Sequence, residues 1–220
     1  MKHPPPDTPV PRATYRLQLN ASFPLEQAEA LADYLDALGV SHLYLSPIFK
    51  ARAGSPHGYD VVDPGALNPE IGTEEGFARL VERLRARGMG VFLDVVPNHL
   101  CIVDPANAWW ADVLENGPSS PFAPFFDIDW HPPKPELRNQ VLLPFLGDQY
   151  GRVLEDREIR VLLEGGAFWV QIGGGARLPL GPSTWRHLLL PALSRLGEDH
   201  PDAVELESIL TALRHLPVRD

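Results

Sequence analysis

Hydrophobic residues in the first hundred positions follow two different periods. Residues 13–19, 41–49 and 90–97 alternate between apolar and polar side chains or run apolar, as strands do. Two segments between them place apolar side chains three and four positions apart, as amphipathic helices do. The order strand, helix, strand, helix, strand predicts right-handed βαβ units around a parallel sheet.

The first expected helix covers residues 22–40. Ser22 is its expected N-cap and Gly39 its stop, because these residue types favour the two ends of a helix. The face that this helix would bury carries Leu31, Leu35 and Leu38.

The second expected helix begins after Thr73 and ends at Gly88. Two glutamates follow Thr73, where they favour the positive end of the helix dipole. Its apolar face would consist of Phe77, Leu80, Val81 and Leu84. Residues 50–72, which precede it, are expected to form a long loop.

This pattern stops after Cys101. The chain then becomes rich in tryptophan and proline, which predicts loops, and residues 158–180 predict short strands joined by glycine turns. Helices are expected at residues 183–196 and 202–216. The second of these has an apolar face formed by Leu206, Ile209, Leu210 and Leu213.

The three N-terminal strands carry polar side chains on one face and mainly Leu and Val on the other. The polar set comprises Arg16, Gln18, His42, Tyr44, Ser46, Asp94 and Asn98. An open doubly wound sheet would be apolar on both faces under its helices. A closed (β/α)8 barrel differs, because its inner face becomes polar toward the carboxyl ends of the strands, where active sites lie.

The composition of the chain limits the classes of binding partner to be expected. The net charge is −10, and no run of basic residues is dense enough to favour nucleic acid or an anionic membrane. The single cysteine cannot form an internal disulfide, and no signal peptide or membrane span is evident. We expect a cytoplasmic protein without nucleic-acid or membrane partners, and the sequence leaves its oligomeric state open.

Two motifs carry candidate binding chemistry. Asp94, Asn98 and His99 end the third strand, where they either hydrogen-bond the local backbone of a turn or hold sugar hydroxyls. In the loop before it, Tyr59 either packs locally or offers an aromatic platform for a sugar ring. Asp60 accepts hydrogen bonds from hydroxyls or pairs with a buried arginine.

The segments TYRLQL, GVSHLYLSP, GSPHGYDVVDP, LNPEIG and DVVPNH together resemble the α-amylase superfamily, glycoside hydrolase family 13. The resemblance implies an α/β fold that is the N-terminal part of a (β/α)8 TIM barrel. Residues 1–99 would form its first three strands with their helices, and residues 100–200 an inserted α+β B domain. Residues 201–220 would form a helix returning towards the barrel.

The resemblance also implies site roles. Tyr59 would stack on the glucose in the −1 subsite and His99 would hydrogen-bond it. Asp94 and Asn98 would organise the strand end, and Asp60 would face the sugar or its supporting arginine.

The segments WWADVLENG, FFDIDW and VLLPFLGD resemble one branch of the family more closely. That branch converts the reducing-end α-1,4 linkage of a maltooligosaccharide into an α,α-1,1 linkage, the reaction of an intramolecular glucosyl transferase and therefore of an isomerase. Two alternatives stay open, an amylase-type hydrolase of α-1,4-glucan and a non-catalytic glucan-binding fragment.

Family enzymes place their nucleophile and general acid/base after the fourth and fifth barrel strands. Both carboxylates are therefore expected beyond residue 220, and the chain alone is expected to be inactive. Asp60 and Asp94 match supporting positions and are not expected to be the reacting pair. Unpaired sheet edges further predict that the isolated chain is marginally stable or prone to aggregation.

No cofactor or metal is expected. The histidines lack metal-ligand spacing, and no carboxylate cluster near Asn98 is dense enough for calcium, which some amylases bind there. The tryptophans either form the core of the B domain or line a glucan path; they are Trp109, Trp110, Trp130, Trp169 and Trp185.

Overall fold

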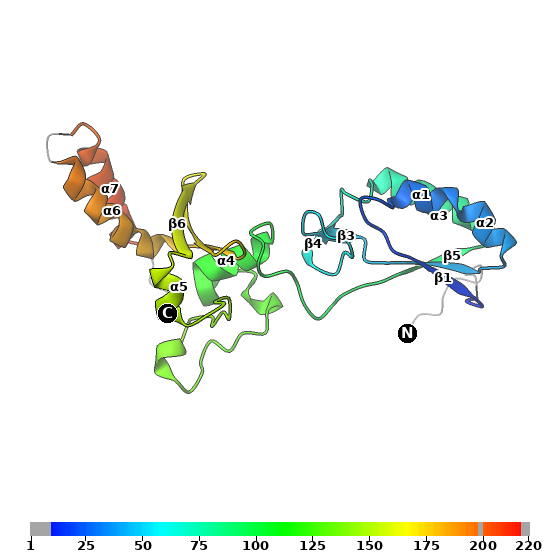
Figure 1. Cartoon of the computed structure of the whole chain (residues 1–220), viewed down its shortest axis with the longest axis horizontal. Coiled ribbons are helices and arrows are strands. Elements are labelled where there is room, and N and C mark those ends of the chain that lie inside the picture. The colour runs from blue at the N-terminus through cyan, green and yellow to red at the C-terminus, as the bar shows by residue number, and fades with distance from the viewer. Residues whose placement is uncertain (1–9, 198–199, 217–220) are drawn as a thin grey trace. The chain divides into compact units, whose positions relative to one another are not determined.

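The chain forms two compact units, Met1–Ile102 and Val103–Asp220, in a computed structural model (Figure 1). The structure describes residues 10–197 and 200–216. The unit boundary lies close to the position at which the βαβ pattern of the sequence ends.

Three parallel strands form the sheet of the first unit. They are β1 (Thr14–Leu17), β2 (His42–Leu45) and β5 (Gly90–Leu93), in the order β1-β2-β5. Each strand falls within one of the three segments for which the sequence predicts a strand. The pairing places Arg16, Tyr44 and Phe92 side by side across the sheet.

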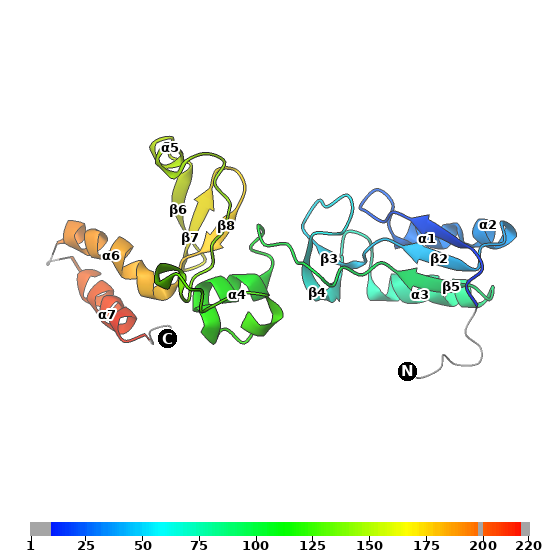
Figure 2. The same cartoon turned by 90° about the horizontal axis from the view of Figure 1, so that it is seen from below.

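Three helices cover one face of this sheet: α1 (Leu25–Ala30), α2 (Ala32–Ala37) and α3 (Glu74–Arg85) (Figures 1 and 2). Leucines of the strands point towards them, and Leu43 and Leu45 of β2 are fully buried. Leu80 and Leu84 of α3 are buried in the same cluster, which confirms the apolar face expected for this helix. Burial of these side chains supplies the main force that joins helices to sheet.

The cap of α3 follows the expectation from the sequence. The hydroxyl of Thr73 accepts a hydrogen bond from the backbone N–H of Gly76, and the acidic Glu74 and Glu75 lie in the first turn.

The prediction of a single helix at residues 22–40 is wrong in two respects. The segment forms two short helices that meet at Leu31, and Pro24 occupies the N-cap position in place of Ser22. The side chain of Asn20 instead accepts hydrogen bonds from the backbone N–H groups of Ser22 and Phe23, which makes a turn before the helix. Leu38, expected on the buried face, is 55% exposed because it caps α2 beyond its last turn.

The prediction of a long loop at residues 50–72 is also wrong. An antiparallel hairpin of β3 (Phe49–Ala51) and β4 (Val61–Leu67) occupies much of it. Val61 and Val62 are buried, and the carbonyl of Val61 accepts a hydrogen bond from the backbone N–H of Cys101. The sequence does not predict β4, because it contains Pro64 and Gly65 and both residue types are rare inside strands.

The second face of the sheet carries rings near the amino ends of its strands. The imidazole of His42 is only 5% exposed and stacks on Phe92, with 4.9 Å between the ring centroids. A Cβ at Gly90 would lie 2.5 Å from the His42 ring, so only glycine leaves room for it.

The second unit begins with α4 (Ala108–Asn116), in a region where the sequence analysis expected loops. That expectation is wrong, because the Asn107 side chain caps the helix by accepting from the backbone N–H of Trp110. Three 3-10 turns and α5 (Tyr150–Glu155) follow; the turns are Gly117–Ser119, Ala123–Phe125 and Pro135–Leu137.

The strands expected at residues 158–180 are confirmed. They form an antiparallel meander of β6 (Ile159–Glu164), β7 (Ala167–Ile172) and β8 (Arg177–Pro179). Gly165 and Gly166 both have positive φ values and form the first turn of this meander.

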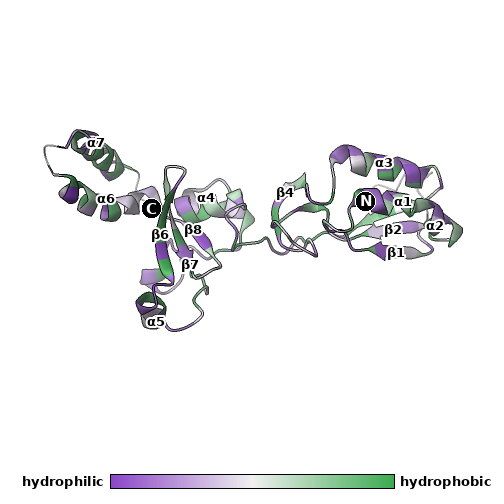
Figure 3. Cartoon of the chain, turned by 45° about the horizontal axis from the view of Figure 1, so that its top comes forward, coloured by the Kyte–Doolittle hydropathy of each residue, from purple (hydrophilic) through white to green (hydrophobic). Residues whose placement is uncertain are grey.

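Two helices follow, α6 (Pro182–Leu196) and α7 (Ala203–Arg214), and they pack against each other. Both carry hydrophobic and hydrophilic residues (Figure 3). Leu210 of α7 is buried, whereas Ile209, expected on the same face, is 44% exposed. Residues 217–220 of the expected C-terminal helix lie outside the described residues. No helix in the described part of the chain has the length and apolar character needed to cross a membrane.

We predict that Leu35→Ala lowers the free energy of unfolding of the first unit by about 2–5 kcal/mol, because the Leu35 side chain is fully buried. The matched control, Leu38→Ala, should change it by less than about 0.5 kcal/mol, since Leu38 is half exposed. Native-state amide exchange on peptides from β2 measures this unit directly. Tryptophan fluorescence does not, because all five tryptophans lie in the second unit. Equal effects of the two changes would contradict the packing described here.

Candidate functional site

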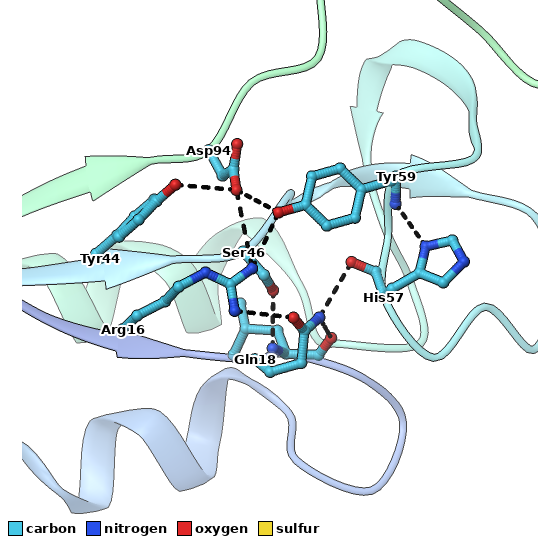
Figure 4. A network of polar contacts seen from close by, with 8 residues as sticks. Arg16, Gln18, Tyr44, Ser46, His57, Tyr59 and Asp94 are labelled. Atoms are coloured by element: carbon cyan, nitrogen blue, oxygen red, sulfur yellow. Dashed lines mark hydrogen bonds and ion pairs between the residues drawn. The ribbon is translucent and has the colours of Figure 1, made fainter.

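Polar side chains from all three parallel strands meet near their carboxyl ends (Figure 4). Arg16 lies on β1 and Tyr44 on β2, and Asp94 follows the last residue of β5. The backbone N–H of Asp94 donates to the carbonyl of Leu45, so Asp94 continues the pairing of the sheet. Register and alternation therefore bring the three side chains to one face of the sheet.

Asp94 is the hub of the cluster. Its Oδ2 accepts hydrogen bonds from the hydroxyls of Tyr59, at 2.6 Å, and Tyr44, at 3.1 Å. The guanidinium of Arg16 lies 3.8 Å from the same oxygen. The Asp94 side chain is 17% exposed, which makes these partners a substantial part of its solvation.

Tyr59 reaches this hub from the loop between β3 and β4. Its hydroxyl accepts a hydrogen bond from Nη2 of Arg16 at 3.0 Å while it donates to Asp94. Donation to Asp94 is the main reason that the pKa of Tyr59 lies above its usual value, and desolvation adds to it. The phenol is therefore neutral at physiological pH and keeps its role as a donor.

The backbone of the same loop is also held to β1. Nε2 of Gln18 donates to the carbonyl of His57 at 3.0 Å, and Oε1 of Gln18 accepts from Nη1 of Arg16 at 3.0 Å. Gly58 follows with a φ of +78°, and a Cβ there would lie 2.9 Å from the carbonyl oxygen of Pro47. The tight passage of the loop therefore requires glycine at position 58.

His99 lies next to Tyr59. Its Nε2 is 3.2 Å from the carbonyl oxygen of Tyr59, and its Nδ1 is 3.1 Å from Oδ1 of Asn98. Both ring nitrogens thus face oxygen atoms that only accept hydrogen bonds, and a neutral imidazole can donate to one of the two. His99 thus contacts the backbone of Tyr59, the residue with which the family resemblance groups it at the sugar site.

Asp60 has different partners from Asp94. Its carboxylate accepts a hydrogen bond from the hydroxyl of Ser55 and lies 3.9 Å from Nδ1 of His57. Ser55 is buried, and its hydroxyl also accepts from the backbone N–H of Gly58. Asp60 therefore braces the loop from within, whereas Asp94 holds it from the sheet.

Direct contacts thus join four of the five residues singled out in the sequence, namely Tyr59, Asp94, Asn98 and His99. The fifth, Asp60, is joined to Tyr59 through Nδ1 of His57. The sequence placed Arg16, Gln18 and Tyr44 on the polar face of the strands but gave them no individual site role, and it gave none to His57. The alternation of polar residues along β1 and β2 was the available signal for Arg16, Gln18 and Tyr44. The carbonyl of His57 left no signal, because a backbone group has no sequence signature.

The arrangement presents an aromatic ring on a firmly held loop beside a carboxylate and a guanidinium. Such a set can stack on a sugar ring and hydrogen-bond its hydroxyls. Among residues 10–197 and 200–216, no three His, Cys, Asp or Glu side chains are grouped so that they could hold a metal ion.

The model of the α-amylase catalytic domain matches residues 29–152, more than half of the chain, and the chain belongs to the α-amylase family. Its fold is accordingly of the α-amylase type, within the TIM-barrel superfamily.

Individual relatives give a finer comparison. The chain is 51% identical over 142 residues to the "Putative maltooligosyl trehalose synthase" of Mycobacterium tuberculosis (strain CDC 1551 / Oshkosh), a match that covers 61% of this chain and 18% of that protein. It superposes on the structure of maltooligosyltrehalose synthase from Arthrobacter ramosus with a TM-score of 0.65 and 41% identity, over 78% of this chain and 21% of the other. These matches confirm the closer resemblance seen in the sequence.

Amylases are also similar. The intracellular maltogenic amylase of Bacillus subtilis (strain 168) is 42% identical over 100 residues, which are 46% of this chain and 16% of that protein. The chain therefore spans less than a fifth of the length of either curated relative.

We predict that Asp94→Asn lowers the pKa of Tyr59 towards the usual tyrosine value of about 10. The neutral phenol is favoured in the folded state, so its contribution to stability is present below the unfolded pKa and is lost as pH rises through the folded pKa. Alkaline absorbance titration measures tyrosinate formation, and Tyr59→Phe identifies the transition that belongs to Tyr59.

Asp60→Asn is the matched control for this titration, because the partners of Asp60 are Ser55 and His57. It should leave the Tyr59 transition in place. A Tyr59 pKa that is the same in the Asp94→Asn variant and the unaltered protein would contradict the hydrogen bond between these residues.

Proposed function

We propose that this chain is part of an intramolecular glucosyl transferase, an isomerase that converts the reducing-end α-1,4 linkage of maltooligosaccharides to an α,α-1,1 linkage. The 51% identity to a protein named as a maltooligosyl trehalose synthase is the observation that carries the proposal. The maltooligosaccharide would be the partner of the site, and the product would be a trehalose-capped chain.

In this proposal the parallel sheet supplies the first three strands of a (β/α)8 barrel, and the second unit contains the inserted B domain. The sheet order β1-β2-β5 and the placement of polar groups at the carboxyl ends of the strands support this assignment. The helix at the end of the described chain, α7, would belong to the segment that leads back to the barrel.

Within the site, Tyr59 would stack on the glucose of the −1 subsite, and His99 would hydrogen-bond the same sugar. Asp94 and Asn98 organise the strand end, and Asp60 supports the loop. Asp60 and Asp94 each accept a hydrogen bond from a protein side chain. This favours a structural role for both carboxylates over a role as the reacting pair. The nucleophile and the general acid/base of the double displacement would come from later strands of the complete protein.

An α-amylase-type hydrolase is the second candidate function, because the chain is also 42% identical to a maltogenic amylase over 100 residues. Both reactions form the same kind of glucosyl intermediate, and they differ in whether a sugar hydroxyl or water attacks it. Analysis of products therefore separates them.

We predict that the complete protein converts maltopentaose into a non-reducing pentasaccharide with an α,α-1,1-linked end. Loss of reducing sugar without loss of chain length, followed by chromatography and NMR of the anomeric protons, measures this outcome. Maltose, maltotriose or glucose as the main products would support the hydrolase. A glucan-binding fragment would bind maltopentaose without converting it.

We further predict that Tyr59→Ala lowers kcat/KM for maltopentaose at least about tenfold, a loss of about 1.4 kcal/mol in transition-state stabilisation. Tyr59→Phe should lose less, because it keeps the ring that stacks on the sugar and removes only the hydroxyl. If the two variants lost activity equally, the hydroxyl would matter and the platform role of the ring would be wrong.

A further inference from the structure

Two side chains of β1 and its continuation hold the loop that carries Tyr59. Arg16 binds the Tyr59 hydroxyl through Nη2, and Gln18 binds the carbonyl of His57 through Nε2 (Figure 4). One contact fixes the tip of the tyrosine side chain, and the other fixes the loop backbone two residues earlier. Together they restrict both the position and the direction of the ring.

The two side chains also orient each other. Nη1 of Arg16 donates to Oε1 of Gln18, which leaves the amide nitrogen of Gln18 pointing to the His57 carbonyl. The planar guanidinium can serve Gln18 and Tyr59 at the same time because its donors form a fixed fork. The guanidinium carbon lies 5.6 Å from the centre of the Tyr44 ring, which packs the fork against β2.

Some of the other contacts of this loop lie within the loop itself. The hydroxyl of Ser55 accepts from the N–H of Gly58, and Nδ1 of His57 accepts from the N–H of Tyr59. These bonds shape the turn but do not place it over the sheet. Placement requires groups outside the loop. Asp94 and His99 contact Tyr59 from the strand end after β5. Arg16 and Gln18 add two contacts from β1 and the residue after it.

We propose that Arg16 and Gln18 form a two-point clamp, a pair of positioning residues that aim the Tyr59 ring at the sugar in the −1 subsite. The proposal rests on the proposed function for the role of Tyr59, and it adds two residues that act through that tyrosine. Neither needs to touch the substrate. A displacement of about 1 Å in a positioning group is enough to slow an enzyme strongly, so such a clamp has kinetic consequences.

Gln18→Ala in the complete protein removes the link to the backbone and the partner of Arg16. We predict that kcat/KM for maltopentaose falls about tenfold, as expected for losing hydrogen bonds that hold a reacting geometry. Gln18→Glu has almost the same shape and still accepts from Arg16, but it places a carboxylate oxygen against the His57 carbonyl. The kcat/KM of Gln18→Glu should therefore stay as low as that of Gln18→Ala. If Gln18 contributed only its side-chain volume, Gln18→Glu would keep the kcat/KM of the unaltered protein.

Gln27→Ala is the matched control, because Gln27 lies exposed on α1, on the helical side of the sheet. It should leave kcat/KM unchanged. Amide exchange on peptides from β2 checks that each variant keeps the first unit folded.

A double-mutant cycle distinguishes positioning from general stability. If Gln18 acts through Tyr59, then Gln18→Ala should cause no further loss in a Tyr59→Ala background. Arg16→Lys keeps the charge but loses the fork, and it should show the same dependence on Tyr59. Losses that add fully in the double variants, or a Gln18→Ala variant with unchanged kcat/KM, would overturn the clamp.

The cycle is independent of which product forms. If the unaltered protein releases shorter maltooligosaccharides, the proposed isomerase function fails, yet coupling between Gln18 and Tyr59 is still measured on the hydrolytic rate. If the trehalose-capped product forms without coupling, the clamp fails and the proposed function stands. If the protein converts no maltopentaose, its Kd for maltopentaose replaces kcat/KM in the same cycle.

Discussion

The site depends on one carboxylate oxygen, Oδ2 of Asp94, which three side chains from different elements share. Tyr44 comes from β2, Arg16 from β1 and Tyr59 from the hairpin loop. These groups are far apart in sequence, and the parallel register of the sheet is what brings them within reach. Because the Asp94 side chain is mostly buried, its charge must be met by such partners, so the strand register and the loop position are coupled.

The covered face of the sheet makes this arrangement possible. Leu43 and Leu45 of β2 are fully buried against the leucines of α3, which fixes the alternation and leaves Arg16, Tyr44 and Asp94 on the other face. A slip of one residue in register would exchange the two faces and place polar groups against the helices. The hydrophobic core therefore determines where the polar cluster lies, although no residue of the cluster belongs to it.

The sequence predicts the features that rest on periodicity. The parallel strands, the helix capped by Thr73 and the antiparallel meander follow alternation, capping and glycine turns, and each is present. Sequence-based prediction fails for elements whose formation depends on tertiary contacts. β4 contains Pro64 and Gly65 and pairs only because β3 lies beside it, and α4 was hidden by its two tryptophans. For the site, the sequence motifs identified Tyr59 and Asp94, but neither their direct hydrogen bond nor the contacts of Arg16 with both could be predicted from the sequence.

The described contacts that orient Tyr59 all come from the first unit. Arg16, Gln18, Asp94 and His99 lie within Met1–Ile102, so the direction of the ring does not depend on where the second unit sits. A platform fixed in advance does not have to be ordered by the substrate, which lowers the entropic cost of binding. If the proposed function holds, the same preorganisation would keep the donor sugar in one orientation while the acceptor sugar of the same chain turns into place.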